Sequence, residues 1–243
     1  MEKVVYLCMI QITIILRCTC CQSTNIKKNG KKNYDDKQNY QCKDCKRQFV
    51  GDHNLTYKGC HSGLGNKIKK MLVRGFGIRD IAAIEDISIS KVLSTLVGLN
   101  YLLKPKQRHY ESLEIDEFYT YVGSKKNKMW LIYAYSRASK EIVCYVWGKR
   151  NHKTARRLRQ KLFDLGISFD VIFSDGLRAF ISAFRGLKHI IGKKNTVGIE
   201  GNNCLLRHRI RRAFRRSCNF SKKLINHIKA FELAFYYINW GRI

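Results

Sequence analysis

Alternating apolar and polar positions define the second half of the chain. The segment Ser112–Val122 is rich in β-branched and aromatic residues, which is typical of a strand. Two similar segments follow, Met129–Tyr135 and Glu141–Trp147, each after a short polar turn. The pattern predicts an antiparallel meander of these three segments.

Helical and extended patterns alternate after this meander. The expected order is helix, strand, helix, strand, helix, over Thr154–Gly166, Phe169–Ser174, Ala179–Phe184, Lys188–Ile191 and a basic segment from Ile199. This order is that of the ribonuclease-H fold, a mixed sheet in which the first and fourth strands are neighbours. A final helix is predicted from apolar residues at helical spacing: Leu224, Ile228, Phe231, Phe235 and Ile238.

A three-helix pattern precedes this α/β half. Periodicity predicts a first helix that ends near Gly75, a second over Ile78–Ile84 and a third over Ser88–Leu96, with Ser88 as its N-cap. We interpret residues 63–98 as a helix-turn-helix domain, and a purely structural bundle is the alternative. The third helix would present these side chains to a DNA groove: Ile89, Ser90, Lys91, Ser94 and Thr95.

Near the N-terminus, two Cys-x-x-Cys pairs are separated by twenty residues. The pairs consist of Cys18, Cys21, Cys42 and Cys45. This spacing is typical of a tetrahedral zinc site of the ribbon type, with a hairpin over Lys27–Tyr40 between the pairs. Cys20 could replace Cys21 only in a cramped Cys-x-Cys geometry. Residues 1–50 are therefore predicted to form a Zn2+-binding ribbon with an N-terminal strand.

The apolar run Val4–Leu16 is too short to span a bilayer. No small-residue cleavage site follows it, so secretion is disfavoured, and the ordinary interpretation is a strand, or an upstream extension, packed on the metal module. Ten cysteines, four of them in metal-type pairs, favour a reducing compartment. The expected location is therefore the cytoplasm.

The net charge of the chain indicates its binding partner. The chain carries 47 Lys and Arg against 18 Asp and Glu, a formal net charge of +29. Such an excess, spread along the whole chain, favours nucleic acid as the partner over an anionic membrane surface. Residues 99–110 hold the single proline and are interpreted as a linker. In the late helical region, Arg209, Arg211 and Arg212 are expected to contact DNA.

Acidic residues are scarce in this chain, and three of them lie where the predicted fold brings distant segments together. Asp116 lies on the first strand, Asp175 at the end of the fourth, and Glu200 at the start of the late helix. Paired carboxylates repel unless a cation lies between them, and Mg2+ would leave positions for water and phosphate oxygens. Alternation along the strand predicts that Glu117 points to the opposite face. Each acid alone also has an ordinary structural explanation, as an edge charge, a turn or a helix-terminal residue.

Together, these blocks resemble the insertion-sequence-one family of transposases, of the InsAB type. The resemblance is carried by the two Cys-x-x-Cys pairs, the helix-turn-helix at Gly75–Leu96, and the blocks Ile115–Gly123, Trp130–Tyr135, Ser174–Gly176 and Ile199–Arg207. It implies a DDE transposase with a catalytic domain over 111–243, in which Asp116, Asp175 and Glu200 bind Mg2+ or Mn2+ and Arg207 contacts a phosphate. Gly201 departs from the family pattern, where a larger polar residue is frequent.

The fold class expected from these observations is α+β and multidomain: a zinc ribbon and helix-turn-helix, followed by a ribonuclease-H-like domain. The expected partner is double-stranded DNA, both terminal inverted repeats and target, with a homodimer in the DNA complex and no membrane. Two alternatives remain. One is a non-catalytic DNA-binding regulator derived from a transposase. The other is a structure-selective nuclease of the same fold, such as a Holliday-junction resolvase.

Overall fold

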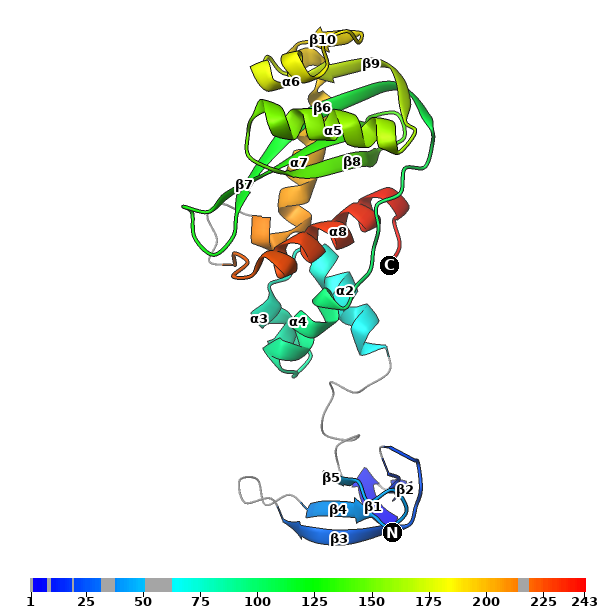
Figure 1. The fold of residues 1–243 in the computed structure, drawn as a ribbon. Coiled ribbons are helices and arrows are strands. Elements are labelled where there is room, and N and C mark those ends of the chain that lie inside the picture. The colour runs from blue at the N-terminus through cyan, green and yellow to red at the C-terminus, as the bar shows by residue number, and fades with distance from the viewer. Residues whose placement is uncertain (1, 8–9, 19, 32–37, 51–62, 214–218) are drawn as a thin grey trace. The chain divides into compact units, whose positions relative to one another are not determined.

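Two compact units, Met1–Ser62 and Gly63–Ile243, make up the chain in this computed structural model (Figure 1). The residues it describes are 2–7, 10–18, 20–31, 38–50, 63–213 and 219–243. The predicted finer division at 63–98, 99–110 and 111–243 stays a prediction. Among the helices of the described residues, none has the length and apolar character needed to cross a bilayer.

The first unit consists of two small antiparallel sheets. Strands β1 (Glu2–Leu7) and β2 (Ile10–Ile15) form a hairpin. The N-terminal apolar run therefore makes two strands, where the sequence predicted one. Strands β3 (Ile26–Lys31), β4 (Gln38–Cys42) and β5 (Gln48–Val50) form the second sheet, with β4 in the middle. The hairpin predicted between the cysteine pairs is confirmed by the β3–β4 pairing.

The three helices predicted before the α/β half are confirmed as α2 (Leu64–Val73), α3 (Ile78–Ile84) and α4 (Ile89–Val97). Ser88 is the N-cap of α4, because its side chain accepts the Lys91 N–H at 3.1 Å. The helices enclose their own apolar core, formed by Leu64, Ile68, Ile81, Ala82 and Val92. Helix α2 ends before a glycine, Gly75, whose φ of +85° an L side chain rarely adopts.

A five-stranded mixed sheet is the centre of the second unit, in the order β10-β9-β6-β7-β8. Its members are β6 (His109–Tyr121), β7 (Lys128–Ser136), β8 (Glu141–Gly148), β9 (Ser168–Ser174) and β10 (His189–Ile191). Strands β6, β7 and β8 form the predicted antiparallel meander, and β9 runs parallel to β6. The predicted adjacency of the first and fourth strands is thus confirmed.

Helices cover both faces of this sheet. On one face, α5 (His152–Asp164) and α6 (Arg178–Ala183) bury a core with Leu113 and Ile115 of β6. On the other, α7 (Val197–Arg209) and α8 (Leu224–Trp240) bury a second core with Phe118. From Leu113 onward, odd- and even-numbered residues of β6 therefore face different helices, as a strand requires.

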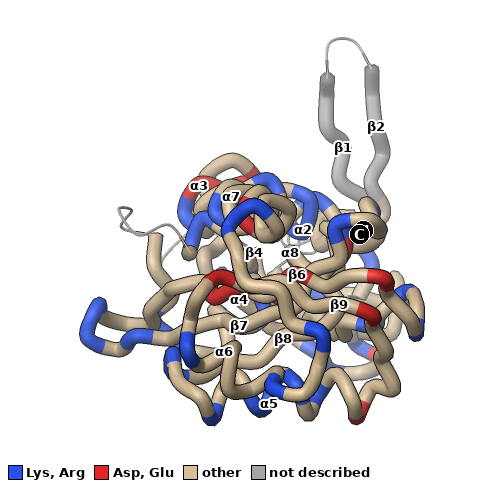
Figure 2. Tube along the Cα trace, turned by 90° about the horizontal axis from the view of Figure 1, so that it is seen from above, with Lys and Arg blue, Asp and Glu red and all other residues tan. Residues whose placement is uncertain are grey.

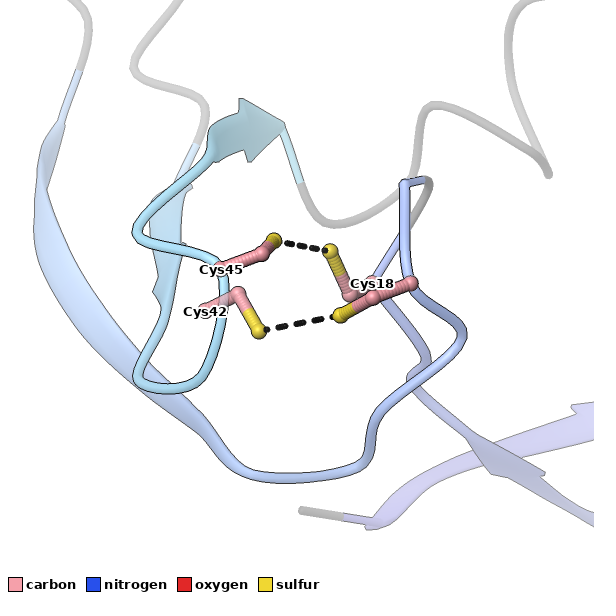
Figure 3. Close-up of side chains that lie close together, drawn as sticks. Cys18, Cys42 and Cys45 are labelled. Carbon is pink, nitrogen blue, oxygen red and sulfur yellow. Dashed lines mark hydrogen bonds between the residues drawn. The ribbon is translucent and has the colours of Figure 1, made fainter.

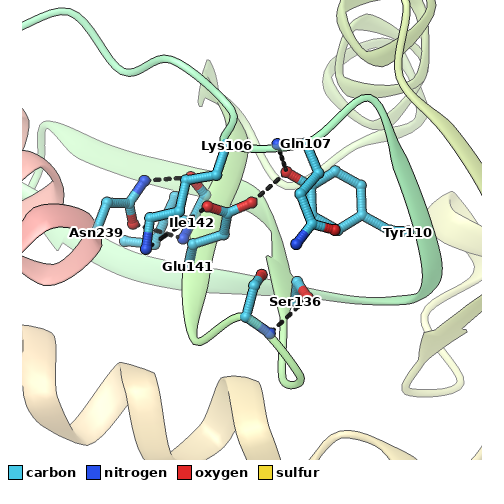
Figure 4. A network of polar contacts seen from close by, with 8 residues as sticks. Lys106, Gln107, Tyr110, Ser136, Glu141, Ile142 and Asn239 are labelled. Atoms are coloured by element: carbon cyan, nitrogen blue, oxygen red, sulfur yellow. Dashed lines mark hydrogen bonds and ion pairs between the residues drawn. The ribbon is translucent and has the colours of Figure 1, made fainter.

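The segment predicted as a linker is packed against the sheet. Strand β6 begins at His109, three residues before the predicted start, and pairs from there with β9. Tyr110 is buried and its hydroxyl donates to Glu141 of β8, which is fully buried (Figure 4). Lys106 lies 4.0 Å from the same carboxylate. Asn239 of α8 bonds both backbone groups of Ile142, at 2.8 and 3.0 Å, and so ties the C-terminal helix to β8.

Tyr110→Phe removes the hydroxyl that donates to Oε1 of the buried Glu141 carboxylate. We expect the free energy of unfolding to fall by about 1–3 kcal/mol in urea denaturation, the cost of a buried acceptor without its donor. A Tyr110→Phe, Glu141→Leu double variant should regain much of the lost free energy of unfolding, because neither polar group remains. Additive losses would show that the pair is not coupled.

Candidate active site and metal centres

Three carboxylates meet beyond the last paired residues of β6 and β9. Oxygen atoms of Asp116, Glu117 and Asp175 all lie within 4.8 Å of one another. The parallel pairing of β6 with β9 ends where Ile115 faces Ser174. Asp116 and Glu117 therefore extend past this end, and Asp175 is the first residue to follow β9. Asp116 and Asp175 lie together, as the sequence predicted.

The position of Glu117 differs from the prediction. Strand alternation predicts that Glu117 points away from Asp116, yet its carboxylate belongs to the acidic group. Its side chain does turn toward the α5 face, where its Oε1 accepts the Nε of Arg150 at 2.6 Å. A carboxylate oxygen of Glu117 nevertheless lies within 4.8 Å of the Asp116 and Asp175 oxygens. Past the end of β9, no strand of the described residues pairs with that side of β6, so side chains from its opposite faces can approach each other there.

The environment of Asp116 holds its carboxylate in place and disfavours its charge. Its Oδ1 accepts the Glu117 N–H at 2.8 Å, and its Oδ2 accepts the side-chain amide of Asn203 at 2.6 Å. Burial, together with the nearby Glu117 and Asp175 charges, raises the pKa of Asp116 to about 7 despite these hydrogen bonds. Burial also raises the pKa of Glu117, against the opposing effect of Arg150.

Helix α7 is docked onto the sheet by buried polar contacts. Glu114, two residues before Asp116 on β6, accepts the Ile199 N–H at 2.6 Å and so caps the first turn of the helix. A side chain at Gly198 would not fit, because its Cβ would lie 2.7 Å from a Glu114 oxygen. Tyr133 of β7 donates to Asn203 at 2.9 Å and accepts from Asn202 at 3.1 Å. These contacts set the position of Asn203 over Asp116.

Glu200 and Arg207 share a helix with Asn203 but do not reach the three carboxylates. Glu200 is exposed, lies near Thr196 at 3.5 Å and is outside the acidic group that the described residues form. Arg207 is half-buried, with its guanidinium 5.0 Å from the centre of the Phe118 ring. The spacing of 200, 203 and 207 places all three residues along one side of α7.

The three-carboxylate group has the composition of a divalent-cation site. Carboxylate oxygens are the ligands that Mg2+ prefers, and the cation needs only a few from the protein. Oε2 of Glu117 is buried and has no hydrogen-bond partner among the described residues. An orphaned buried oxygen, a neighbouring aspartate pair and a raised pKa all fit a group of side chains completed by a cation.

A second cluster, in the first unit, consists of four cysteines. Cys18 and Cys45 place their sulfurs 3.5 Å apart, and Cys21 and Cys42 place theirs 3.6 Å apart (Figure 3). Tetrahedral zinc with Zn–S bonds of about 2.3 Å requires sulfurs about 3.8 Å apart. Backbone N–H groups of Cys21 and Cys20 lower the pKa of Cys18 to about 6, which favours the thiolate that binds metal. Cys20 is exposed and outside the group.

The side chains predicted to face DNA occupy two places. On α4, Ile89, Ser90 and Ser94 are exposed, whereas Lys91 and Thr95 are partly covered. After α7, Arg211 is exposed. Basic positions recur over α5, α7 and the surrounding loops of this unit (Figure 2).

The other two arginines of this set make contacts inside the protein. Arg209 donates to the Val73 carbonyl of α2 at 3.3 Å and lies 5.1 Å from the Tyr237 ring centre. Arg212 donates to Ser221 at 3.1 Å, and burial lowers its pKa. Both therefore stabilise the packing around α7, a role that sequence alone did not indicate.

Sequence reasoning missed several residues around the acidic group. Asn203 lies inside a block that carried the family resemblance, yet it received no role there. Tyr133 lies in another such block, where the strand pattern indicates no role beyond packing. Glu114 precedes Asp116 by two positions, so its place on the same face was the available signal. Arg150 had no signal, since basic residues are common throughout this chain.

The chain thus combines a mixed α/β unit that carries a carboxylate cluster with a four-cysteine cluster, and each cluster could hold a metal ion. A profile of the IS1 transposase family matches residues 111–239, about half of the chain. The protein InsB of insertion element IS1 2 from Escherichia coli (strain K12) is 39% identical over 118 residues, which cover 48% of this chain and 68% of that protein. InsB from Shigella flexneri is 37% identical over 118 residues, covering 48% and 87%. The chain therefore belongs to the IS1 transposase family.

One solved structure is also similar, that of the simian T-cell lymphotropic virus intasome in complex with PP2A regulatory subunit B56 gamma. It aligns with a TM-score of 0.37 and 15% identity, over 68% of this chain and 66% of that chain. At that score, the similarity carries no argument about this chain.

Asp116→Asn tests the electrostatic cost of the acidic group. A carboxylate whose pKa is raised on folding stabilises the folded state at low pH, and this contribution is lost as pH rises from about 4 to about 7. Above pH 7, the free energy of unfolding of the metal-free variant should therefore exceed that of the wild type by about 4 kcal/mol. The measurement is urea denaturation at pH 5 and pH 8 in a chelator. Equal pH dependence of the two proteins would contradict the raised pKa.

Cys42→Ser tests the zinc site. We expect wild-type protein to contain one zinc per chain, and the variant to lose it together with the folded state of the first unit. Elemental analysis and NMR spectra of that unit measure both effects. Cys20→Ser is the matched control and should keep its zinc, because Cys20 lies outside the cluster. Zinc retained in Cys42→Ser would rule the site out.

Proposed function

We propose that the protein is a DNA transposase that binds the terminal inverted repeats of its element, cleaves at the ends and joins the 3′-hydroxyls to target DNA. The observation that carries this proposal is the group formed by Asp116, Glu117 and Asp175, which lies within the part of the chain matched by the IS1 transposase profile. The sheet order, with β9 beside β6 and parallel to it, supports a ribonuclease-H-like catalytic domain.

The residues in this proposal have distinct tasks. Asp116, Asp175 and Glu200 would hold Mg2+ or Mn2+, which when bound activates the attacking oxygen and stabilises the leaving one. Asn203 orients Asp116 through its amide. Glu200 lies one turn before Asn203 on the same side of α7, from which a change of rotamer would turn it toward the site. Arg207, one turn beyond, would contact a DNA phosphate.

DNA binding in this proposal is divided between the two units. Helix α4 would enter a DNA groove through Ile89, Ser90, Lys91, Ser94 and Thr95. Hydroxyls of Ser94 and Thr95 now donate to the Lys91 carbonyl, at 3.0 and 2.9 Å, and could turn to base edges or phosphates. Arg211 is exposed next to this region, whereas Arg209 and Arg212 would act indirectly by holding the helices. The four-cysteine ribbon would carry Zn2+ and a basic surface.

A cavity beside α4 supports the same placement of DNA. It encloses about 440 Å3 between the three helices and the segment after α7, and Ile89, Arg79, Arg211 and Lys222 are among its lining residues. Positively charged side chains at its border would attract phosphates. In the bound state we propose a homodimer, since two element ends must be joined. The net charge of +29 suits a complex with two DNA segments, terminal repeat and target.

Asp116→Asn and Asp175→Asn should each lower Mg2+-dependent cleavage and strand transfer by about a hundredfold or more, because metal-held charge stabilisation is worth several kcal/mol. The assay uses full-length protein and duplexes carrying the DNA that flanks its gene. Asp164→Asn, an exposed acid at the end of α5, is the matched control.

Unchanged strand transfer in Asp116→Asn would overturn the proposed activity. Specific binding of the flanking repeats without any cleavage by wild-type protein would instead favour a DNA-binding regulator. Cleavage of four-way junctions without dependence on those repeats would favour a structure-selective nuclease.

A further inference from the structure

We propose that Glu117 is a ligand of the divalent cation held by Asp116 and Asp175, and that Arg150 is its counter-charge when no cation is bound. The proposal rests on the function proposed above and adds a residue to its metal centre. It is carried by three observations: the distances among the acids, the burial of Glu117, and the oxygen of Glu117 that has no partner.

The distances between carboxylate oxygens place Glu117 within the proposed metal centre. One oxygen from each of Asp116, Glu117 and Asp175 lies within 4.8 Å of the other two. Oxygens bound to one Mg2+ at about 2.0–2.1 Å are at most about 4.2 Å apart, so small side-chain rotations would bring all three to one ion. Glu200 would need a larger rotation, because it is exposed and outside this group.

The burial of Glu117 provides independent evidence that its carboxylate has a further partner. Only 8% of the side chain is exposed, and Oε2 is buried without a hydrogen bond from any described residue. A buried carboxylate oxygen without a donor costs about 1–3 kcal/mol or more, so such atoms are rare unless something binds them. A cation between the three acids would supply the missing interaction for this oxygen.

Arg150 explains how the site remains folded without that cation. Its Nε donates to Oε1 of Glu117 at 2.6 Å, which leaves Oε2 unused. The guanidinium also lies 5.6 Å from the Trp130 ring centre, and 43% of the Arg150 side chain is exposed. One Glu117 oxygen therefore holds Arg150 at the border of the site while the other remains for metal.

Mn2+ binding to full-length, zinc-loaded protein tests this assignment without depending on catalysis. The probe is Mn2+ itself, followed by electron paramagnetic resonance of the free ion, with and without a DNA duplex. We expect Glu117→Gln to weaken Mn2+ binding by roughly tenfold or more, since even residues that only orient a ligand contribute 10–100-fold. Glu111→Gln, an exposed acid on the same strand, is the matched control and should bind as wild type.

Arg150→Gln separates a ligand from a structural ion pair. If Glu117 binds metal, removal of its competing counter-charge should strengthen Mn2+ binding several-fold while it lowers the melting temperature of the metal-free protein. If the pair is only structural, Glu117→Gln and Arg150→Gln will both lower the melting temperature and leave Mn2+ affinity unchanged. That result overturns the assignment.

The failure of this inference differs from the failure of the proposed function. Mn2+ binding that is lost in Asp116→Asn but unchanged in Glu117→Gln would overturn the role of Glu117 and keep the transposase centre. Wild-type protein that binds no Mn2+, alone or on DNA, would overturn both. Melting temperature and zinc content of each variant identify any loss of folding.

Discussion

The repulsion among Asp116, Glu117 and Asp175 is the physical constraint on which the second unit depends. Three carboxylates within 4.8 Å of one another disfavour each other's charge, and burial adds to this effect. The protein compensates only in part, through Asn203 on Asp116 and Arg150 on Glu117. The raised pKa of Asp116, about 7, is the remaining cost. A divalent cation would remove that cost, and in the proposed transposase the same cation would serve phosphate chemistry.

The central sheet and helix α7 both contribute to the acidic group. The end of the β6–β9 pairing brings the two aspartates together, whereas α7 supplies the groups that surround them. Its position depends on Glu114 at its first turn and on Tyr133 in its middle, both buried. At its far end, the His208 carbonyl oxygen lies so close to Gly75 that a Cβ there would be 2.2 Å away. The helix thus connects the acidic group with the end of α2, and its orientation affects both.

Local patterns in the sequence were sufficient for the elements and for part of the site. Alternation and turn residues predicted the meander, helical spacing predicted the three small helices, and the Cys-x-x-Cys pairs predicted the sulfur cluster. Asp116 and Asp175 are predicted to meet because the strand order places the first and fourth strands side by side, and the β6–β9 pairing ends at Ile115 and Ser174. These features depend on chemistry within a few residues, or on topology.

The other features of the fold and the site depend on how distant segments of the chain pack together. The periodicity of the sequence carries no information about that packing. Alternation gave the face of Glu117 correctly, but it did not give the distance between side chains where β9 has ended. Strand β6 extends into the predicted linker because Tyr110 finds Glu141 on another strand. Arg209 was expected on DNA, yet it binds the carbonyl of Val73, 136 residues earlier in the chain. Each difference involves a long-range partner that no local signal names.

We propose above that the three acids beyond the end of the β6–β9 pairing form one cation site. Anomalous scattering from a crystal of the full-length protein soaked in Mn2+ tests this most directly. We predict an anomalous peak about 2.0–2.2 Å from oxygens of Asp116, Glu117 and Asp175, with Oε2 as the bound oxygen of Glu117. A peak bound by Asp116 and Asp175 but not by Glu117 would contradict this prediction, as would the absence of any peak at these acids.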